Sequence, residues 1–308
     1  MPSLRESLNQ SAVVRGELLR RFGFMPMSLL RLSRGKLSRS MFNYQGEEKG
    51  RSVTNAGDAG MRLAKSAEGK ASAAERKKLG IIGGVLTSQK GTSRTGASIM
   101  PAELVEFFVK YYAAPGDVYL DPFMGQGVQM QVAHRYGLHY WGFDLCEEFF
   151  RYIEAVRAKI DTGTTTIRTF LADSKNPDPI PDGIGDFCFT SPPYWDIEWY
   201  GDDPEQLGIG KSYPDFIAGM EAVARAWLPK FKPGATCVVN VNDFRKDGRF
   251  YPYHADTVSL FRRAGWAVHD IWIVEGLIAG LPRVFAADKN SKRIAPKVHE
   301  YAIVFRRP

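Results

Sequence analysis

Short apolar runs of the β type alternate with helix-like patterns along the last two thirds of the chain. The clearest helical pattern follows Pro101, a residue that favours the first turn of a helix. Its apolar positions, spaced at i, i+3, i+4 and i+7, are Leu104, Phe107, Phe108 and Tyr111. Further strands are predicted at residues 117–120, 139–143, 166–171, 184–189, 235–241, 266–274 and 301–306, and further helices at residues 128–136, 146–160, 214–231 and 255–264. This alternation predicts an α/β fold with a doubly wound sheet.

The first 90 residues differ from the rest in pattern. Residues 13–30 carry apolar positions that predict one or two short helices, whereas residues 45–78 contain few large apolar side chains and predict a linker, a flexible loop or a solvated helix. Ordered structure is expected to resume near residues 79–86. We therefore predict two units: a partly helical N-terminal extension at residues 1–90 and an α/β domain at residues 91–308.

Charge separates the same two parts of the chain. Residues 1–95 hold 18 Lys and Arg against 7 Asp and Glu, so the net charge of +7 comes entirely from this part. A basic extension of this kind is typical of contact with phosphates and predicts DNA as a partner. A solvated tail has the same composition and remains the alternative.

The turn after the strand at residues 184–189 is the most informative stretch. It reads Thr-Ser-Pro-Pro-Tyr-Trp over residues 190–195, and its two prolines must break the strand. Open α/β sheets bind their ligands at such carboxyl ends of strands. The Ser191 hydroxyl and the Pro192 carbonyl can accept hydrogen bonds there, while Tyr194 offers a flat face to a planar ring.

Three further strand ends carry polar or glycine-rich chemistry. The strand at residues 117–120 runs into a turn with Gly125 and Gly127, where a ligand can approach the backbone closely. The next strand ends in Asp144, about 20 positions after the glycines, where a carboxylate can accept both hydroxyls of a ribose. The third ends in Asp173. Each feature by itself fits an ordinary turn, but their succession predicts one binding site.

These motifs resemble the amino-group DNA methyltransferases that use S-adenosylmethionine. Residues 121–127 resemble the cofactor motif of that family, and residues 191–194 resemble its catalytic motif in the serine form, which goes mostly with N4-cytosine methylation. Residues 98–104 occupy the place of a segment that touches the methionine carboxylate, although the usual Lys-Pro pair is absent. Residues 299–305 resemble the last strand of the family.

The resemblance covers residues 97–308 and implies a Rossmann-like methyltransferase sheet of seven strands, the last one antiparallel. It also implies S-adenosylmethionine as cofactor, DNA as substrate and a place in restriction–modification. The predicted cofactor-binding residues are Ser98, Asp121, Phe123, Gly125, Gly127, Asp144 and Asp173. The predicted catalytic residues are Ser191, Pro192, Pro193 and Tyr194.

Cytosine N4 is the favoured target, and several alternatives stay open. Hydrogen bonds to the amino group can localise its lone pair for direct displacement on a base that has left the duplex. N6-adenine methylation uses the same chemistry, and a catalytically inactive relative that binds DNA or cofactor is the rival from another class. RNA or a protein glutamine is less favoured as substrate. C5-cytosine methylation requires a nucleophilic cysteine, typically after proline, and no cysteine of this chain follows one.

The remaining sequence indicates how DNA is contacted and where the protein works. Two loops are candidates for DNA contact in place of a recognition domain: residues 196–213, with Trp199 and Tyr200, and the basic residues 276–298. Three cysteines and no apolar stretch of spanning length indicate a soluble cytoplasmic protein with no membrane partner. The five histidines show no metal-ligand spacing, so no metal is predicted. The oligomeric state is left open.

Overall fold

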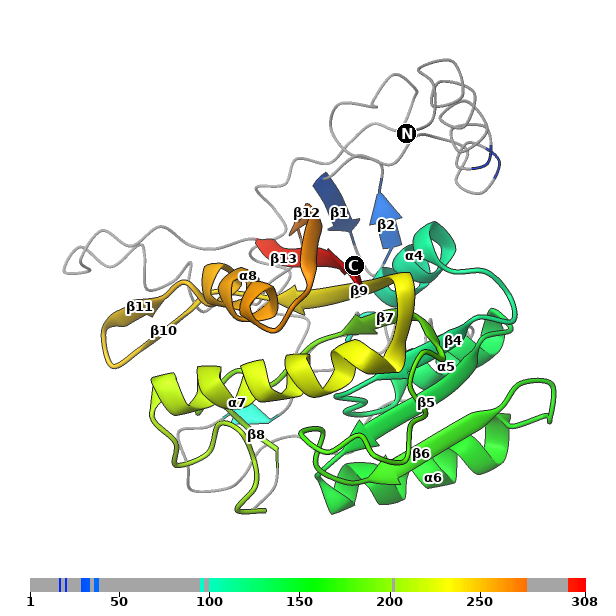
Figure 1. The fold of residues 1–308 in the computed structure, drawn as a ribbon, viewed down its shortest axis with the longest axis horizontal. Coiled ribbons are helices and arrows are strands. Elements are labelled where there is room, and N and C mark those ends of the chain that lie inside the picture. Colours follow the sequence, from blue (N-terminus) through cyan, green and yellow to red (C-terminus); the bar gives the residue numbers. More distant parts are fainter. Residues whose placement is uncertain are drawn as a thin grey trace, which may run out of the picture.

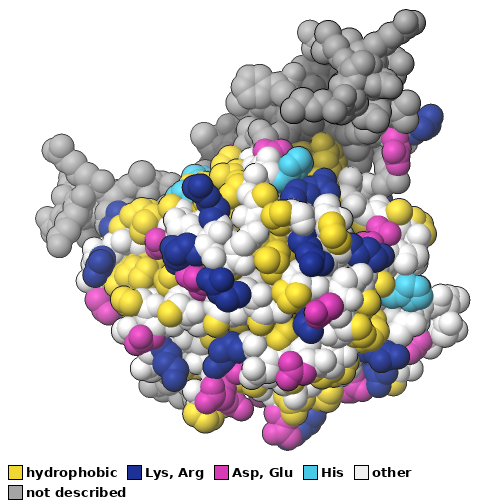
Figure 2. Space-filling view, in the orientation of Figure 1, with side chains coloured by type: hydrophobic (Ala, Val, Ile, Leu, Met, Phe, Trp, Pro, Cys, Tyr) yellow, Lys and Arg dark blue, Asp and Glu magenta, His cyan; other side chains and the backbone are white. Residues whose placement is uncertain are grey.

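A central sheet organises the protein (Figure 1), and the face seen in this orientation carries both acidic and basic side chains (Figure 2). The computed structural model describes residues 17, 20, 29–33, 36–38, 95–96, 100–200, 203–275 and 299–308. Within these residues the sheet has nine strands. Side by side they are β2 (Lys36–Ser38), β1 (Leu29–Ser33), β12 (Ala267–Glu275), β13 (His299–Arg306), β9 (Phe231–Val241), β7 (Gly185–Thr190), β4 (Val118–Asp121), β5 (His139–Asp144) and β6 (Ile167–Leu171).

The seven strands from β4 onward confirm the predicted sheet. Strands β4, β5, β6, β7 and β9 are parallel, and β13 runs antiparallel to both β9 and β12. The chain order along the sheet reverses between β4 and β7, because β5 and β6 lie on one side of β4 and the later strands lie on the other. The carboxyl ends of two strands at such a reversal diverge and leave a crevice.

Two further strands come from the predicted N-terminal extension. Strand β1 pairs in parallel with β12, with Leu29 opposite Ile273, and β2 pairs antiparallel with β1. The helix prediction for residues 13–30 is therefore wrong at its end, where the backbone of Leu29 and Leu30 is extended. Part of the sequence before residue 90 thus belongs to the sheet. The linker at residues 45–78 and the resumption at residues 79–86 lie outside the described residues.

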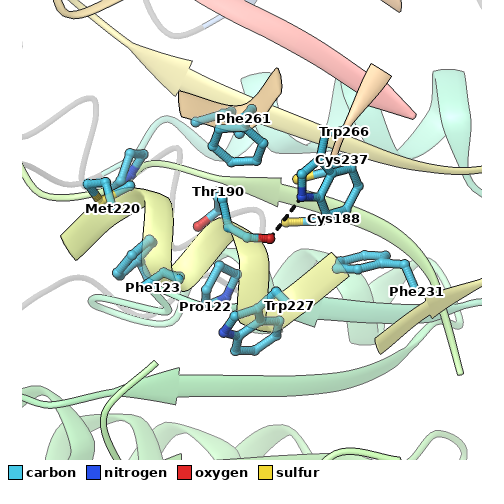
Figure 3. A pocket seen from close by; sticks show the side chains of 14 residues that line it. Pro122, Phe123, Cys188, Thr190, Met220, Trp227, Phe231, Cys237, Phe261 and Trp266 are labelled. Carbon is cyan, nitrogen blue, oxygen red and sulfur yellow. Dashed lines mark hydrogen bonds between the residues drawn. The ribbon is translucent and has the colours of Figure 1, made fainter. Parts of the chain in front are cut away.

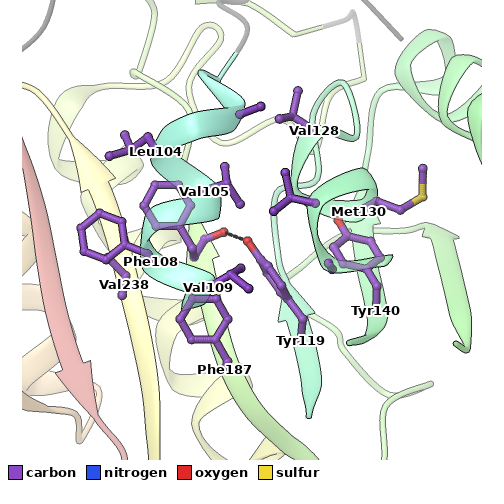
Figure 4. Close-up of a cluster of buried hydrophobic side chains, with 14 of the residues drawn as sticks. Leu104, Val105, Phe108, Val109, Tyr119, Val128, Met130, Tyr140, Phe187 and Val238 are labelled. Atoms are coloured by element: carbon purple, nitrogen blue, oxygen red, sulfur yellow. Dashed lines mark hydrogen bonds between the residues drawn. The ribbon is translucent and has the colours of Figure 1, made fainter. Parts of the chain in front are cut away.

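Helices cover both faces of the sheet. On one face lie α4 (Ala102–Tyr112), α5 (Val128–Arg135) and α6 (Glu147–Ile160), and on the other lie α7 (Tyr213–Trp227) and α8 (Tyr253–Arg263). The predicted stripe of α4 is buried, with Leu104 and Phe108 both 0% exposed. Figure 4 shows Phe108 of α4 in the same cluster of buried side chains as Phe187 and Val238 of the sheet. The side chains of β7 alternate between the two faces, so Phe189 joins this cluster and Cys188 the opposite one.

Helix α7 ends earlier than its apolar pattern predicts. The Ser212 hydroxyl caps its first turn by accepting a hydrogen bond from the Asp215 amide at 3.2 Å. The helix stops at Trp227, a 3-10 turn follows at Leu228–Lys230, and Phe231 already begins β9. The predicted extension to Phe231 is therefore wrong. Pro229 explains the stop, because it lacks the amide hydrogen that another helical turn requires.

Two small strand pairs were not predicted. Strand β3 (Thr95–Gly96) pairs in parallel with β8 (Glu198–Trp199), which lies just after the Pro-Pro-Tyr turn. Strands β10 (Phe244–Lys246) and β11 (Arg249–Tyr251) form a hairpin after the carboxyl end of β9. Asp247 and Gly248 connect them with φ angles of +50° and +76°. An Asp-Gly pair between short strands is the usual signal for such a turn.

Candidate active site

The loop after β4 brings its backbone to the carboxyl edge of the sheet. The Met124 amide donates to the Phe143 carbonyl at 2.9 Å, which ties the loop to β5. Gly125 and Gly127 have φ angles of +49° and +73°, a region that favours glycine. A Cβ on Gly127 would lie 3.2 Å from Ile153 of α6, whereas a Cβ on Gly125 would meet no atom within 4 Å. Gly127 therefore permits close helix packing, and Gly125 leaves open space beside the backbone.

Asp144 holds this loop from the end of β5. Its carboxylate accepts hydrogen bonds from the Gly125 amide and the Cys146 amide, both at 2.8 Å. Burial nevertheless dominates and raises the pKa of Asp144 to about 7. The carboxyl therefore changes charge near neutral pH, at the wall of the open space beside Gly125.

Asp121 lies beneath the loop and not on its open side. Its side chain is 0% exposed and accepts hydrogen bonds from the Tyr140 hydroxyl of β5 and the Thr190 hydroxyl of β7, both at 2.9 Å. The Phe123 amide donates to it at 3.1 Å. Burial raises the pKa of Asp121 to about 6 despite these bonds. The structure places this predicted cofactor residue as a link between strands and loop, away from the pocket walls.

Asp173 stands after β6 and is held by a lysine. Its carboxylate accepts a hydrogen bond from the Lys175 amide at 2.8 Å, and the Lys175 ammonium lies 3.1 Å away. Lys175 also reaches Glu205, at 2.8 Å, in the segment after the Pro-Pro-Tyr turn. This ion pair network connects the end of β6 to the loop that follows β7.

The Pro-Pro-Tyr turn leaves the end of β7 in a strained conformation. Pro192 and Pro193 are buried, and Ser191 and Tyr194 are half-buried. Trp195 has a φ of +46°, which is uncommon for any residue other than glycine. Its indole nitrogen donates to the Lys211 carbonyl at 2.9 Å, and the Ile197 amide donates to the Tyr194 carbonyl at 3.0 Å. The surrounding loop therefore holds the turn in place.

The ring of Tyr194 is set by neighbouring aromatic side chains. It meets Tyr253 and Phe244 edge-on, with ring centroids 6.0 and 6.4 Å apart. The Tyr194 amide donates to the Tyr200 hydroxyl at 3.3 Å. Burial, followed by the nearby carboxylates of Glu300 and Glu198, raises the pKa of Tyr194 well above its usual range. The side chain is therefore neutral at physiological pH.

Two adjoining pockets open at this edge of the sheet. The first, which we call the Asp144 pocket, has a volume of about 550 Å³. The second, which we call the Tyr194 pocket, has a volume of about 520 Å³. Asp173, Leu145 and Pro193 also line the Asp144 pocket, and Gln126, Glu198 and Pro192 also line the Tyr194 pocket. Both pockets share Phe123, Gly125, Phe149, Ser191 and Tyr200. The glycine loop after β4 and the Pro-Pro-Tyr turn after β7 therefore line one site that consists of two adjoining pockets.

Sequence reasoning missed several residues of this site. Phe149, on the first turn of α6, contributes an apolar wall to both pockets. Glu198 lines the Tyr194 pocket, and its carboxylate accepts a hydrogen bond from the Tyr200 hydroxyl. Tyr200 was predicted as an aromatic residue of the DNA-contacting loop at residues 196–213, whereas no motif or spacing in the sequence pointed to Glu198. Only the β3–β8 pairing and the turn place this carboxylate in the same pocket as Ser191.

A third cavity is small and apolar and belongs to the core (Figure 3). It lies between strands β7 and β9 and the helices α7 and α8, with Cys188, Cys237 and Trp227 in its lining. The Trp266 indole donates to the Ala224 carbonyl at 2.9 Å, as the dashed line in Figure 3 shows. Pro122 and Pro192 line this cavity from the loops after β4 and β7, so they separate it from the polar site.

Some predicted site residues cannot be placed. Ser98 and the basic loop at residues 276–298 lie outside the described residues, as does the side chain of Trp199. In the described part of the chain, no three His, Cys, Asp or Glu side chains are grouped to hold a metal ion. No helix there is long and apolar enough to cross a membrane.

One known protein family matches part of the chain. Residues 58–155 match the family of DNA methylases of the N6/N4 type. The match includes the glycine loop and Asp144 and ends before Ser191. No curated protein sequence matches the chain. The family uses S-adenosylmethionine, which confirms the predicted cofactor.

Solved structures with similar folds share little sequence with this chain. A SAM-dependent methyltransferase from Aquifex aeolicus is 15% identical with a TM-score of 0.41, covering 66% of this chain and 89% of its own. The [4+2]-cyclase SpnF is 13% identical with a TM-score of 0.49, covering 82% and 96%. A protein from Thermus thermophilus that is assigned as a DNA modification methylase is 22% identical with a TM-score of 0.34, covering 44% and 51%.

The residues at the edge of the sheet fit the cofactor. The open space beside Gly125 admits a ligand against the backbone, and the Asp144 carboxylate can accept ribose hydroxyls. Leu145 and Phe149 supply apolar walls for a planar ring, and Asp173 supplies an acceptor for an amino group. The Asp144 pocket therefore holds groups of the kind that bind an adenosine.

Cofactor binding is expected to strengthen as pH rises through 7. If the ionised Asp144 carboxylate accepts the ribose hydroxyls, protonation at low pH removes that acceptor, because its pKa is about 7. Affinity for S-adenosylhomocysteine should then rise about tenfold between pH 6 and pH 8 relative to Asp144→Asn, measured by calorimetric titration. Dividing the wild-type affinity by the affinity of Asp144→Asn at each pH cancels any pH dependence that comes from ionisation of the ligand itself. An equal ratio at both pH values contradicts a ribose contact by this carboxylate.

Gly208→Ala is expected to displace the Pro-Pro-Tyr turn. A Cβ on Gly208 would lie 2.1 Å from the Trp195 carbonyl oxygen, so the backbone must move. Urea unfolding should show a loss of about 1–3 kcal/mol, and methyl transfer should fall with it. Gly210→Ala is the control, since its Cβ would meet nothing within 4 Å and only its φ of +69° is unfavourable. Full activity in Gly208→Ala refutes the role given to this packing.

Proposed function

We propose that this chain, in which residues 58–155 match the family of DNA methylases of the N6/N4 type, uses S-adenosylmethionine to methylate the exocyclic amino group of a flipped base in DNA, with cytosine N4 favoured. The observation that carries this proposal is the position of Ser191. This residue lines both the Asp144 pocket and the Tyr194 pocket. A hydroxyl at this junction stands between a bound cofactor and a base that enters beside Tyr194.

The chain orients the reacting groups and does no covalent chemistry itself. When bound, S-adenosylmethionine would supply an electrophilic methyl group and be left as S-adenosylhomocysteine, while the methylated nitrogen would release one proton to the solvent. The amino group of the target base donates one hydrogen bond to the Ser191 hydroxyl and one to the Pro192 carbonyl, which localises the nitrogen lone pair for in-line attack. Tyr194 stacks on the base and holds it outside the duplex. The neutral tyrosine suits this role, because burial holds its pKa far above physiological pH.

The choice of base follows from the residue before the two prolines. A serine hydroxyl accepts a hydrogen bond without carrying charge, and this form of the motif goes mostly with cytosine N4 in the family. Carbon methylation at C5 is not supported, because Cys146, Cys188 and Cys237 are all buried and none lines either pocket. Adenine N6 is the second candidate, since it presents an amino group in the same chemistry.

The product separates these candidates directly. Duplex DNA incubated with the protein and labelled S-adenosylmethionine should yield labelled N4-methylcytosine when its nucleosides are analysed by mass spectrometry. N6-methyladenine without N4-methylcytosine contradicts the choice of base and leaves the amino-group chemistry standing. Absence of both, with cofactor binding intact, favours the inactive relative.

Ser191→Ala is expected to slow methyl transfer and leave cofactor affinity nearly unchanged. One hydrogen bond to the reacting amino group is lost, which corresponds to a roughly 10- to 100-fold lower single-turnover rate. Calorimetric titration with S-adenosylhomocysteine serves as the control for the Asp144 pocket. Wild-type turnover in this variant refutes Ser191 as a catalytic residue.

Tyr194→Ala is expected to lower turnover on DNA through the loss of stacking. Stacking on one base is worth about 1–3 kcal/mol, so the rate should fall on the order of ten- to a hundredfold. Tyr194→Phe keeps the ring and should retain most of the activity. Equal losses in the two variants would assign the effect to the hydroxyl, and stacking would then be the wrong explanation.

A further inference from the structure

The hairpin β10–β11 stands at the same edge of the sheet as the two pockets. It begins three residues after the end of β9 and projects from the body of the protein in Figure 1. Cross-strand register pairs Phe244 with Tyr251 and Arg245 with Phe250. Since side chains alternate along a strand, these two pairs face opposite sides of the hairpin. One side therefore packs on the protein and the other is presented to solvent.

The inner side is anchored to the catalytic turn. Tyr251 lies against Trp195 and Tyr213, with ring centroids 5.2 and 4.6 Å apart. Phe244 contacts Tyr194 itself, with ring centroids 6.4 Å apart. Lys246 forms an ion pair with Asp196 at 2.5 Å and lies 4.8 Å from the centre of the Trp195 ring. The hairpin is therefore in direct contact, through Phe244, with Tyr194, the residue that would hold the target base.

The outer side combines a cation with an exposed aromatic ring. Phe250 is 39% exposed, and the Arg245 guanidinium lies 5.0 Å from the centre of its ring. Arg249 alternates onto the other side of the hairpin, opposite Lys246, where its guanidinium lies 5.3 Å from the ring centre of Tyr251, but its side chain is exposed as well. In the part of the chain that the structure describes, neither arginine pairs with a carboxylate. By contrast, exposed arginines on the helices, such as Arg151 and Arg225, are paired with glutamates.

This composition suits a nucleic-acid strand. A guanidinium binds phosphate oxygens through paired hydrogen bonds, and an exposed ring stacks on bases or packs on sugars. One exposed phenylalanine offers too little apolar area to hold a membrane surface. The cross-strand pair of Arg245 and Phe250, with the exposed Arg249 next to it on the same hairpin, therefore favours a phosphate-bearing strand.

We propose that the hairpin β10–β11 is a DNA-contacting element, with Arg245 and Arg249 on phosphates and Phe250 on the strand next to the target base. The proposal rests on the proposed function and adds the surface that delivers the base to Tyr194. A contact here places the strand at the mouth of the Tyr194 pocket, because Phe244 and Tyr251 connect the hairpin to the catalytic turn.

The test is the salt dependence of DNA binding by the full chain. Fluorescence anisotropy with a labelled duplex, in the presence of S-adenosylhomocysteine, gives the slope of log affinity against log salt. Each lost phosphate contact removes about 0.9 from this slope, so Arg245→Ala/Arg249→Ala should lower it by about 1.8. Phe250→Ala should keep the slope and weaken binding roughly tenfold. Both variants should bind S-adenosylhomocysteine as tightly as the wild type.

The matched control removes two charges from the opposite edge of the sheet. Arg135 and Lys159 are exposed near the carboxyl ends of α5 and α6, and Arg135→Ala/Lys159→Ala should leave the slope unchanged. If the wild type methylates DNA and the hairpin variant has the same salt slope as the wild type, the hairpin assignment is overturned and the proposed function stays intact. A wild type that neither binds nor methylates DNA overturns both. If the hairpin variant keeps the salt slope of the wild type but no longer binds a protein partner, the hairpin is assigned to protein binding instead.

Discussion

The buried carboxylate of Asp121 is the interaction on which the site depends. A charge without solvent must be compensated by hydrogen bonds, and its three donors come from β5, from β7 and from the cofactor loop. The residue that precedes Ser191 and the loop that carries Gly125 are thereby attached to one carboxylate. Loss of this side chain would leave the Tyr140 and Thr190 hydroxyls without that acceptor, at the point where the two halves of the site meet.

The second half of the site is held by packing and strain. Trp195 adopts a left-handed backbone conformation, which persists only when its surroundings determine it. Gly208 leaves room for the Trp195 carbonyl, and the Lys211 carbonyl accepts a hydrogen bond from the Trp195 indole. The rings of Tyr213 and Tyr251 enclose the Trp195 side chain. Because Tyr194 immediately precedes this residue, the same packing orients the ring proposed to stack on the base.

The two pockets differ in their electrostatic character. The Asp144 pocket contains carboxylates, one of which titrates near neutral pH, and these suit the hydroxyl and amino groups of an adenosine. The Tyr194 pocket is bordered by neutral aromatic rings and by the carboxylate of Glu198. Arg245 and Arg249 stand outside it, on the hairpin. Positive charge is therefore available to the DNA backbone while the catalytic turn stays uncharged at Ser191.

The α/β class, the seven strands and the positions of Gly125, Asp144 and Ser191 at strand ends could be predicted from the sequence, because alternating apolar patterns and glycine and proline turns are local signals. The sequence also presented Asp121 as a cofactor residue. Only the tertiary structure moved that carboxylate beneath the loop, placed Glu198 in the pocket, added β1 and β2 to the sheet, and set the hairpin beside Tyr194. These features depend on contacts between segments far apart in the chain, which no local pattern encodes.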